Sequence, residues 1–383
     1  MKRVTILGVT GSIGRQGLEV IDHNPDTFLL HGISAHKNVD SLIKTAIKYR
    51  PKYAVIADEK LFSKLREALS GTDTIPLAGH KAIAEIAADS ETDIVLTGLV
   101  GSVGLIPLNA AVCAGKIVAL ANKEPIVIAG DIIMKNAREH NATIIPVDSE
   151  PSAIYQALRG EDASKINKII LTASGGALKD LSLEELKNVT PERALKHPTW
   201  EMGKKITIDC ATLINKGLEV IEAHHLFSVP YEKIEVLVHP ESVVHSMVEF
   251  TDGVIMAQLG APTMKTPIQY ALYEGKRDGI NFGGLNLAEI SNLTFMTPDF
   301  ERFPALKLAI DAGRGGKSQA ITLNAANSFA VEAFLSEKIT FTDIPKIIEW
   351  ALENIEIEEC NTIDEVLLSD ENTTKKLNER INR

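Results

Sequence analysis

The stretch Val4-Thr5-Ile6-Leu7-Gly8-Val9-Thr10-Gly11-Ser12-Ile13-Gly14 decides the fold. An apolar run, Val4–Leu7, ends in a turn with glycines at three-residue spacing, and a helical pattern follows over residues 15–23. Glycines between a first strand and a helix admit a pyrophosphate, which the helix N-terminus attracts. The same glycines also fit a plain tight turn. Their place inside a strand–helix–strand unit favours a dinucleotide site.

Short apolar runs alternate with helical patterns over residues 1–150. The predicted strands are Val4–Leu7, Phe28–Ile33, Tyr53–Ile56, Asp93–Leu96, Ile117–Leu120 and Ala142–Ile145. This alternation predicts a mostly parallel sheet covered by helices. Residues 1–150 are therefore expected to form a Rossmann-like, dinucleotide-binding domain of an α/β protein.

The segment after the second predicted strand would meet the adenine ribose. An NAD site usually offers an acidic residue there, and an NADP site offers a cation. The segment carries Lys37, with Asn38 as a hydrogen-bond partner, so NADPH is the better prediction. The alternatives are that Lys37 is an ordinary surface lysine and that Asp40 caps the next helix.

Polar residues and glycines also follow later strands. Residues 97–104 are glycine-rich, and glycines at this end of a strand line the crevice of an open α/β sheet. Asn122, Lys123 and Glu124 follow the next strand and are candidates to meet the nicotinamide and the substrate. The alternative is a helix start, with Asn122 as N-cap and Glu124 in the first turn.

Two carboxylates flank a serine in Pro146-Val147-Asp148-Ser149-Glu150. Side chains two apart on a strand point the same way, so Asp148 and Glu150 are expected on one face of a strand end. Two like charges there need a neutraliser, and carboxylate oxygens suit Mg²⁺ or Mn²⁺. The alternative is a solvated strand end that caps the next helix.

Residues 151–275 change character and are expected to form a catalytic, metal- and substrate-binding domain. Ser174-Gly175-Gly176 follows a predicted strand, Ile166–Leu171, and is either an anion cradle or a plain connector. Residues 195–205 are polar and lack periodicity, which is typical of a loop that closes over substrate, or of an ordinary surface loop.

The segment Ile206–Glu222 is the richest in polar candidates. Asn215, Lys216 and Glu219 share one helical face. A lysine beside an asparagine suits a phosphate, and Glu219 is a candidate third metal ligand. The alternative is a Lys216–Glu219 surface ion pair worth about 0.3–0.5 kcal/mol.

The last part of the chain is expected to be a dimerisation sheet followed by helices. Val236–Pro240, Val243–Phe250 and Val254–Leu259 are predicted to form an antiparallel meander. Residues 276–300 are rich in Gly and Asn and are predicted to link domains. Residues 301–383 are predicted to form a small bundle of four helices, Pro304–Ala312, Ala320–Leu335, Ile344–Glu353 and Ile363–Arg380.

Bulk properties limit the class of protein. A chain of 383 residues predicts two or three domains. A net charge of −11 argues against a general nucleic-acid binder. No apolar run approaches the roughly 18 residues that span a bilayer. Three scattered cysteines and a chain that starts with a strand indicate a cytoplasmic protein without a signal peptide.

Taken together, the motifs resemble the 1-deoxy-D-xylulose 5-phosphate reductoisomerase family over nearly the whole chain. The matching segments are Thr10-Gly11-Ser12-Ile13, Ala121-Asn122-Lys123-Glu124, Pro146–Glu150, His197-Pro198 with Trp200, Asn215–Glu219, Met247 after His245-Ser246, and Leu323-Asn324-Ala325-Ala326-Asn327. The resemblance implies an NADPH- and Mg²⁺- or Mn²⁺-dependent enzyme, a homodimer, that makes 2-C-methyl-D-erythritol 4-phosphate for isoprenoid biosynthesis.

The resemblance also implies roles for matching residues. NADPH would be held by Thr10, Gly11, Ser12, Ile13, Lys37, Asn38, Asn122, Glu124 and Gly203. The metal would be held by Asp148, Glu150 and Glu219, and Lys123 would assist catalysis. The substrate would contact Lys123, Ser149, Glu150, Ser174, His197, Trp200, Met202, Cys210, Asn215, Lys216 and Glu219, with Trp200 and Met202 on the closing flap, residues 195–205.

Three positions depart from the family pattern. Pro151 stands where a histidine is usual, Cys210 where a phosphate-binding serine is usual, and His36 where a glycine is usual. A thiol is a weak hydrogen-bond donor, so Cys210 is expected to lower phosphate affinity. Two alternatives therefore stay open: a paralogous NADPH-dependent oxidoreductase acting on another phosphorylated sugar, and a catalytically silent NADP-binding paralogue.

Overall fold

The protein forms two compact units. The computed structural model describes residues 1–197, 200, 202–356 and 359–381. The first unit consists of Met1–Pro125, Ile133–Ser152 and Thr263–Gly283, and the second of Ile126–Ile132, Ala153–Pro262 and Gly284–Arg383. The expected ranges 1–150, 151–275, 276–300 and 301–383 divide the chain differently, and that division into domains stays a prediction.

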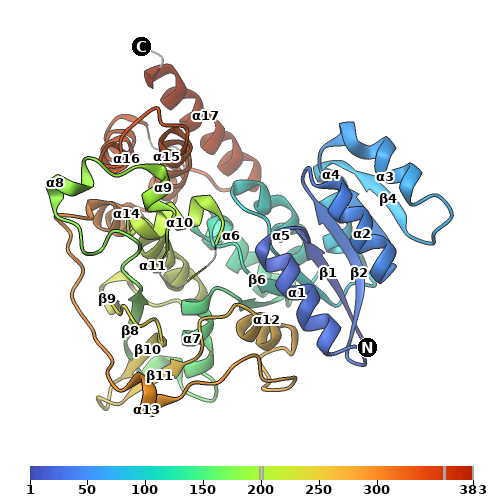
Figure 1. The fold of residues 1–383 in the computed structure, drawn as a ribbon, viewed down its shortest axis with the longest axis horizontal. Coiled ribbons are helices and arrows are strands. Elements are labelled where there is room, and N and C mark those ends of the chain that lie inside the picture. The colour runs from blue at the N-terminus through green and yellow to red at the C-terminus, as the bar shows by residue number, and fades with distance from the viewer. Residues whose placement is uncertain (198–199, 201, 357–358, 382–383) are drawn as a thin grey trace. The chain divides into compact units, whose positions relative to one another are not determined.

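A seven-stranded parallel sheet is the centre of the first unit (Figure 1). Its strands are β1 (Lys2–Leu7), β2 (Phe28–Ala35), β3 (Tyr53–Ile56), β4 (Ile75–Ala78), β5 (Ile94–Thr97), β6 (Ile117–Leu120) and β7 (Thr143–Pro146). Their order across the sheet is β4-β3-β2-β1-β5-β6-β7. The apolar side chains of β1 and β5 are fully buried, as expected for strands covered on both faces of the sheet. The predicted Rossmann-like fold is confirmed.

The strand order creates a switch point between β1 and β5. The chain runs outward from β1 to β4, and then returns to place β5 on the other side of β1. Val4 on β1 pairs with Ile94 on β5, and Leu7 with Thr97. In open α/β sheets, ligands bind beyond the carboxyl ends of the strands at such a point. The turns after β1 and β5 are therefore where a ligand is expected.

The helices of this unit connect successive strands. They are α1 (Ser12–His23), α2 (Val39–Tyr49), α3 (Phe62–Ala68), α4 (Gly79–Ala88), α5 (Leu105–Cys113) and the later α12 (Lys265–Leu272), with 3-10 turns at Glu59–Leu61 and Ser102–Gly104. Two further helices, α6 (Glu124–Glu139) and α7 (Ser149–Ala157), begin in this unit. Segment α12 returns late in the sequence, and the Tyr273 hydroxyl that follows it donates to Asn24.

A four-stranded mixed sheet lies in the second unit. Its strands are β8 (Ile166–Ala173), β9 (Ile234–Val238), β10 (Val244–Phe250) and β11 (Ile255–Leu259), in the order β11-β10-β8-β9. The predicted three-strand meander is wrong, because β9 pairs in parallel with β8 and only β10 and β11 form an antiparallel hairpin. The long segment between β8 and β9 allows this crossover, since it holds helices that return the chain.

Helices make up the rest of the second unit. They are α8 (Leu183–Leu186), α9 (Pro191–Ala194), α10 (Lys204–Ala211), α11 (Ile214–Phe227), α13 (Leu287–Ile290), α14 (Pro304–Arg314), α15 (Lys317–Leu335), α16 (Asp343–Asn354) and α17 (Ile363–Ile381), with 3-10 turns at Ala163–Lys165 and Tyr231–Lys233. The four predicted C-terminal helices are confirmed as α14 to α17. Among the described residues, no helix is both long and apolar enough to cross a membrane.

The C-terminal helices pack closely on α11. Gly217 of α11 faces Ala309 of α14 so tightly that any side chain at Gly217 would overlap the Ala309 methyl group. Within residues 276–300, whose role as a linker stays a prediction, Met296 forms backbone hydrogen bonds with Val238 at the end of β9. Helix α14 therefore starts from a segment that is fixed to the mixed sheet.

Candidate functional site

The turn after β1 has the geometry of a dinucleotide site. Gly8 has φ +83°, and a methyl group there would lie 2.6 Å from the carbonyl oxygen of Gly98, in the loop after β5. Gly11 is the N-cap of α1 and supplies no side chain to cap it. The first backbone N–H groups of α1, from Ser12 onward, are thus available to an anion such as a pyrophosphate.

Asn122 and Glu124 form hydrogen bonds to the Gly101 backbone, in the loop that follows β5 at the switch point. The Asn122 amide donates to the Gly101 carbonyl at 3.0 Å, and the Glu124 carboxylate accepts from the Gly101 N–H. Both side chains are buried, and Gly101 has φ +86°. The alternative that Asn122 caps the next helix is wrong in detail, because the N-cap is Lys123, although Asn122 Oδ1 does accept from the Glu124 N–H.

Lys37 and Asn38 lie directly after β2, as the NADP prediction requires. Lys37 is exposed, and Asn38 is the N-cap of α2, with its Oδ1 accepting from the Ser41 N–H at 3.1 Å. Asn38, and not Asp40, therefore caps this helix. Asp40 instead forms an ion pair with Lys64 at 2.7 Å, between two exposed side chains.

The acidic segment is a strand-to-helix turn and not a strand end. β7 ends at Pro146 and α7 begins at Ser149, so Asp148 lies in the turn and Glu150 in the first helical turn. The expected shared strand face is therefore wrong. Lys123 Nζ lies 2.5 Å from Asp148 Oδ2, and Ser149 Oγ donates to Glu150 Oε2 at 2.5 Å. Two carboxylates, a hydroxyl and an ammonium group are thus gathered at one edge of the sheet.

Pro151 has a local explanation. It lies in the first turn of α7, where a backbone N–H has no partner within the helix and a proline is well tolerated. Pro151 is buried, so it also contributes packing at this position. The departure from the family pattern therefore costs the helix nothing.

Glu219 is the most buried of the predicted metal ligands. Its side chain has 0% exposure, and it accepts hydrogen bonds from Asn215 Nδ2 at 2.6 Å and from Lys216 Nζ. The alternative, a Lys216–Glu219 ion pair, is present, but the pair is buried and not on the surface, because the Lys216 side chain is only 4% exposed. A buried carboxylate needs such donors or a metal ion, since leaving it uncompensated costs several kcal/mol.

The Ser174 turn and the flap residue His197 meet in the second unit. Ser174 Oγ lies 3.0 Å from His197 Nε2 and accepts from the Gly176 N–H at 3.2 Å. His197 Nδ1 accepts from the Trp200 N–H at 2.9 Å. Burial lowers the pKa of His197. Pro198, Thr199 and Glu201 of the predicted flap lie outside the described residues.

His245, which the sequence predicts to be structural, lies beside Trp200 of the predicted flap. The His245 ring lies 6.3 Å from the Trp200 ring, and burial lowers the pKa of His245 to about 4. His245 is therefore neutral near pH 7.

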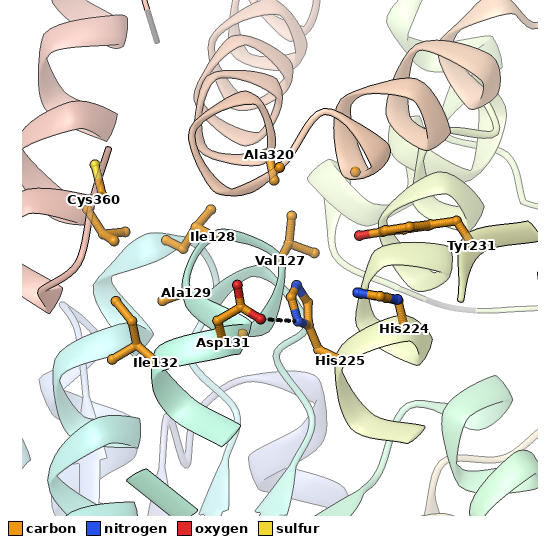
Figure 2. A pocket seen from close by; sticks show the side chains of 14 residues that line it. Val127, Ile128, Ala129, Asp131, Ile132, His224, His225, Tyr231, Ala320 and Cys360 are labelled. Atoms are coloured by element: carbon orange, nitrogen blue, oxygen red, sulfur yellow. Dashed lines mark ion pairs between the residues drawn. The ribbon is translucent and has the colours of Figure 1, made fainter. Parts of the chain in front are cut away.

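A pocket of about 240 Å³ lies in the second unit (Figure 2). His225 faces Asp131 at 3.5 Å, and the His224 ring stacks on Tyr231 with centroids 4.1 Å apart. The segment Val127–Ile132 of α6 forms one wall, where α6 is kinked at Ala129. None of the predicted site residues lines this pocket.

Comparisons with known proteins give one consistent result. One family model, described as 1-deoxy-D-xylulose 5-phosphate reductoisomerase, matches residues 4–130, and two models of that enzyme's C-terminal domain match residues 144–227 and 259–376. A Clostridium perfringens relative with this name is 47% identical over 100% of both chains, and a Geobacillus relative is 50% identical over 98% of both.

Solved structures agree with these relatives. The Zymomonas mobilis enzyme in complex with NADPH is 43% identical, with a TM-score of 0.93 over 99% of both chains. A further reductoisomerase in complex with NADPH, fosmidomycin and magnesium is 40% identical, with a TM-score of 0.94 over 100% of this chain and 98% of that one.

The fold, the glycine turn at the switch point and these relatives define an NADP-dependent oxidoreductase. Within that class, the chain belongs to the 1-deoxy-D-xylulose 5-phosphate reductoisomerase family.

Proposed function

We propose which residues carry out the family's reaction in this chain. That reaction is the NADPH- and divalent-metal-dependent rearrangement and reduction of 1-deoxy-D-xylulose 5-phosphate to 2-C-methyl-D-erythritol 4-phosphate, a step of isoprenoid biosynthesis. The observation that carries the assignment is the acidic turn at Asp148 and Glu150, with the Lys123 ammonium 2.5 Å from Asp148. The relatives bound to NADPH and magnesium support it.

Asp148, Glu150 and Glu219 are the proposed metal ligands. Their carboxylate oxygens are the donors that Mg²⁺ prefers, and Glu219 is held in place by Asn215 and Lys216 in a fully buried position. When bound, the metal supplies Lewis-acid stabilisation of negative charge on the substrate oxygens. Mn²⁺ satisfies the same ligands, so we propose that it supports the reaction as well.

The proposed NADPH site follows the carboxyl ends of the first unit's strands. Thr10, Gly11, Ser12 and Ile13 present the N-terminus of α1 to the pyrophosphate. Lys37 and Asn38 recognise the 2′-phosphate, Asn122 and Glu124 fix the Gly101 loop, and Gly203 contacts the cofactor from the flap end. When bound, NADPH supplies the hydride.

The remaining residues hold the substrate and exclude water. Ser174, His197, Asn215, Lys216 and Cys210 are proposed to bind the phosphate, whose binding energy positions the reacting end. Ser149 contacts the substrate next to Glu150, and Lys123 assists proton transfer or stabilises charge there. Trp200 and Met202 close over the site, which removes water from the reaction.

The two alternatives gain no support from the structure. Pro151 fits the first turn of α7, and Lys123, Asn215, Lys216 and the three carboxylates are all present. A paralogue with another substrate and a silent NADP-binding protein therefore have no observation in their favour beyond Cys210 and His36.

We also propose a cytoplasmic homodimer. β11 is an edge strand of the mixed sheet, and Ile255, Met256 and Leu259 on it are 49%, 44% and 37% exposed. Exposed apolar edge strands pair with other chains unless they are protected. The cytoplasmic location rests on the resemblance and on the three cysteines, among which the described structure has no disulfide.

The assignment of the metal ligands is tested with Glu219→Gln, which keeps the shape and removes the charge. We expect Mn²⁺ binding, measured by electron paramagnetic resonance, to weaken by about 100-fold or more, the scale of losing one charged ligand. Turnover should vanish. The NADPH dissociation constant should stay within about twofold of the wild-type value, because Glu219 is not among the residues proposed to bind NADPH. Retained turnover would remove Glu219 from the site.

A further inference from the structure

The motif Leu323-Asn324-Ala325-Ala326-Asn327 has no role in the reaction described so far. It lies in α15, and both asparagines are buried, although amides are costly to bury without hydrogen bonds. Asn327 has 0% exposure, and its amide donates to Asp209 Oδ1 on α10 at 2.8 Å. A buried polar contact therefore ties α15 to α10.

Asp209 receives a donor on each carboxylate oxygen. Lys205 Nζ, one helical turn earlier on α10, lies 2.9 Å from Asp209 Oδ2. The Asp209 side chain is only 4% exposed, and a buried carboxylate costs several kcal/mol unless it is paired and hydrogen-bonded. Asn327 and Lys205 together stabilise Asp209, so α10 has one preferred position against α15.

The Ser174 turn packs against helix α10. A methyl group at Gly176 would lie 2.5 Å from the Cys210 carbonyl oxygen and 2.9 Å from Ala211 Cα. The turn thus packs directly on the backbone of α10, one residue beyond Asp209. Ser174 Oγ accepts a hydrogen bond from the Gly176 N–H within the turn and is hydrogen-bonded to His197 Nε2. Any displacement of α10 therefore moves both Cys210 and the Ser174 turn.

We propose that Asn327 is a positioning residue for the phosphate end of the substrate. It acts through Asp209, whose fixed place on α10 sets the positions of Cys210 and of the Ser174 turn. The inference rests on the proposed function, in which Ser174, His197 and Cys210 hold the phosphate. It gives the C-terminal helices a part in substrate binding that is distinct from the metal and the cofactor.

The test is Asn327→Leu, which is close in volume and removes the donor. The KM for 1-deoxy-D-xylulose 5-phosphate should rise about tenfold, the equivalent of one hydrogen bond to a charged group. The inhibition constant of inorganic phosphate should rise in parallel. The NADPH dissociation constant should stay within about twofold of the wild-type value, because the residues proposed to bind NADPH are separate from the Asn327–Asp209 contact. Asn327→Ser, a smaller change, is measured in the same way if the leucine variant does not fold.

A matched control and a swap separate positioning from general damage. Asn324→Leu removes another buried amide from α15, but in the described structure Asn324 makes no hydrogen bond to Asp209. It should lower the melting temperature and leave both phosphate constants unchanged. The double variant Asp209→Asn with Asn327→Asp restores an amide–carboxylate pair and should recover part of the affinity that either single change loses.

The proposal is overturned if the Asn327 variants keep the wild-type KM and phosphate inhibition, if Asn324→Leu raises them equally, or if the swap is no better than the single changes. Absence of turnover in the unmodified chain would instead contradict the proposed function. The two failures are therefore distinguishable.

Discussion

Cys210 is the residue whose chemistry departs most from the family pattern in the proposed phosphate site. The thiol donates a weaker hydrogen bond than the hydroxyl that is usual at this position. We predict that Cys210→Ser lowers the KM for 1-deoxy-D-xylulose 5-phosphate by about two- to tenfold, the range of one modest hydrogen bond. Steady-state kinetics at saturating NADPH measure this change. A large loss of activity would show that the thiol has a different role.

The neutral state of His245 makes stability depend on pH. Burial lowers its pKa from 6.5 to about 4, so between these values the unfolded chain binds a proton that the folded chain does not. The contribution of His245 to the free energy of unfolding is therefore fully present above pH 6.5. It falls by up to about 3 kcal/mol as the pH drops towards 4. Urea unfolding at a series of pH values should show this loss.

The control for His245 is His245→Gln, which does not titrate. Its free energy of unfolding should fall less steeply than that of the unmodified chain between pH 6.5 and 4, since the carboxylates contribute equally to both. Parallel curves would mean that His245 is protonated in the folded chain.

At the level of residues, the sequence indicates which side chains suit a site, but not which partners those side chains have. Lys123, Asp148, Glu150 and Glu219 are candidates because their types suit a metal and a phosphorylated sugar, and their roles stay a prediction. The Lys123–Asp148 pair and the burial of Glu219 depend on how α6, α7 and α11 begin, and periodicity does not fix helix starts to one residue. The Asn327–Asp209 bond joins residues 118 positions apart, which no local pattern reveals.

Among the elements, the Ser174-Gly175-Gly176 turn gives a direct test of packing. Gly176 has φ +70° and its missing side chain would meet Cys210, whereas Gly160 has φ +86° and open space around it. Gly160→Ala should cost about 1–2 kcal/mol for the left-handed backbone alone. Gly176→Ala should cost about 1–3 kcal/mol more for the overlap, and should raise the substrate KM. Equal losses in thermal unfolding would contradict the packing of this turn on α10.

Element prediction succeeded where one pattern dominated. Buried parallel strands such as β3 and β6 are short, continuous apolar runs, and their bounds were predicted correctly. β4 was missed because Ile-Pro-Leu-Ala is short, contains proline and lies at a sheet edge, where proline is tolerated. The meander was wrong because pairing partners are chosen by tertiary packing, and β8 lies between β9 and β10.

For the whole molecule, the exposed edge strand predicts self-association. Met256→Lys places a charge on β11 and should convert the proposed dimer to monomers in sedimentation velocity experiments, because charges on an edge oppose strand pairing. Ile47→Lys is the control, since Ile47 is 54% exposed but lies on α2. A dimer that survives Met256→Lys, or a chain that is monomeric without any change, would contradict the proposed assembly.

The central claim concerns the reaction itself, and one measurement tests it most directly. The purified chain is mixed with NADPH, Mg²⁺ and 1-deoxy-D-xylulose 5-phosphate, and NADPH oxidation at 340 nm is followed together with the product by mass spectrometry. We predict one 2-C-methyl-D-erythritol 4-phosphate formed per NADPH oxidised, with the rate lost on chelation by EDTA and restored by Mg²⁺. No oxidation of NADPH with this substrate, at any Mg²⁺ or Mn²⁺ concentration, would contradict the account.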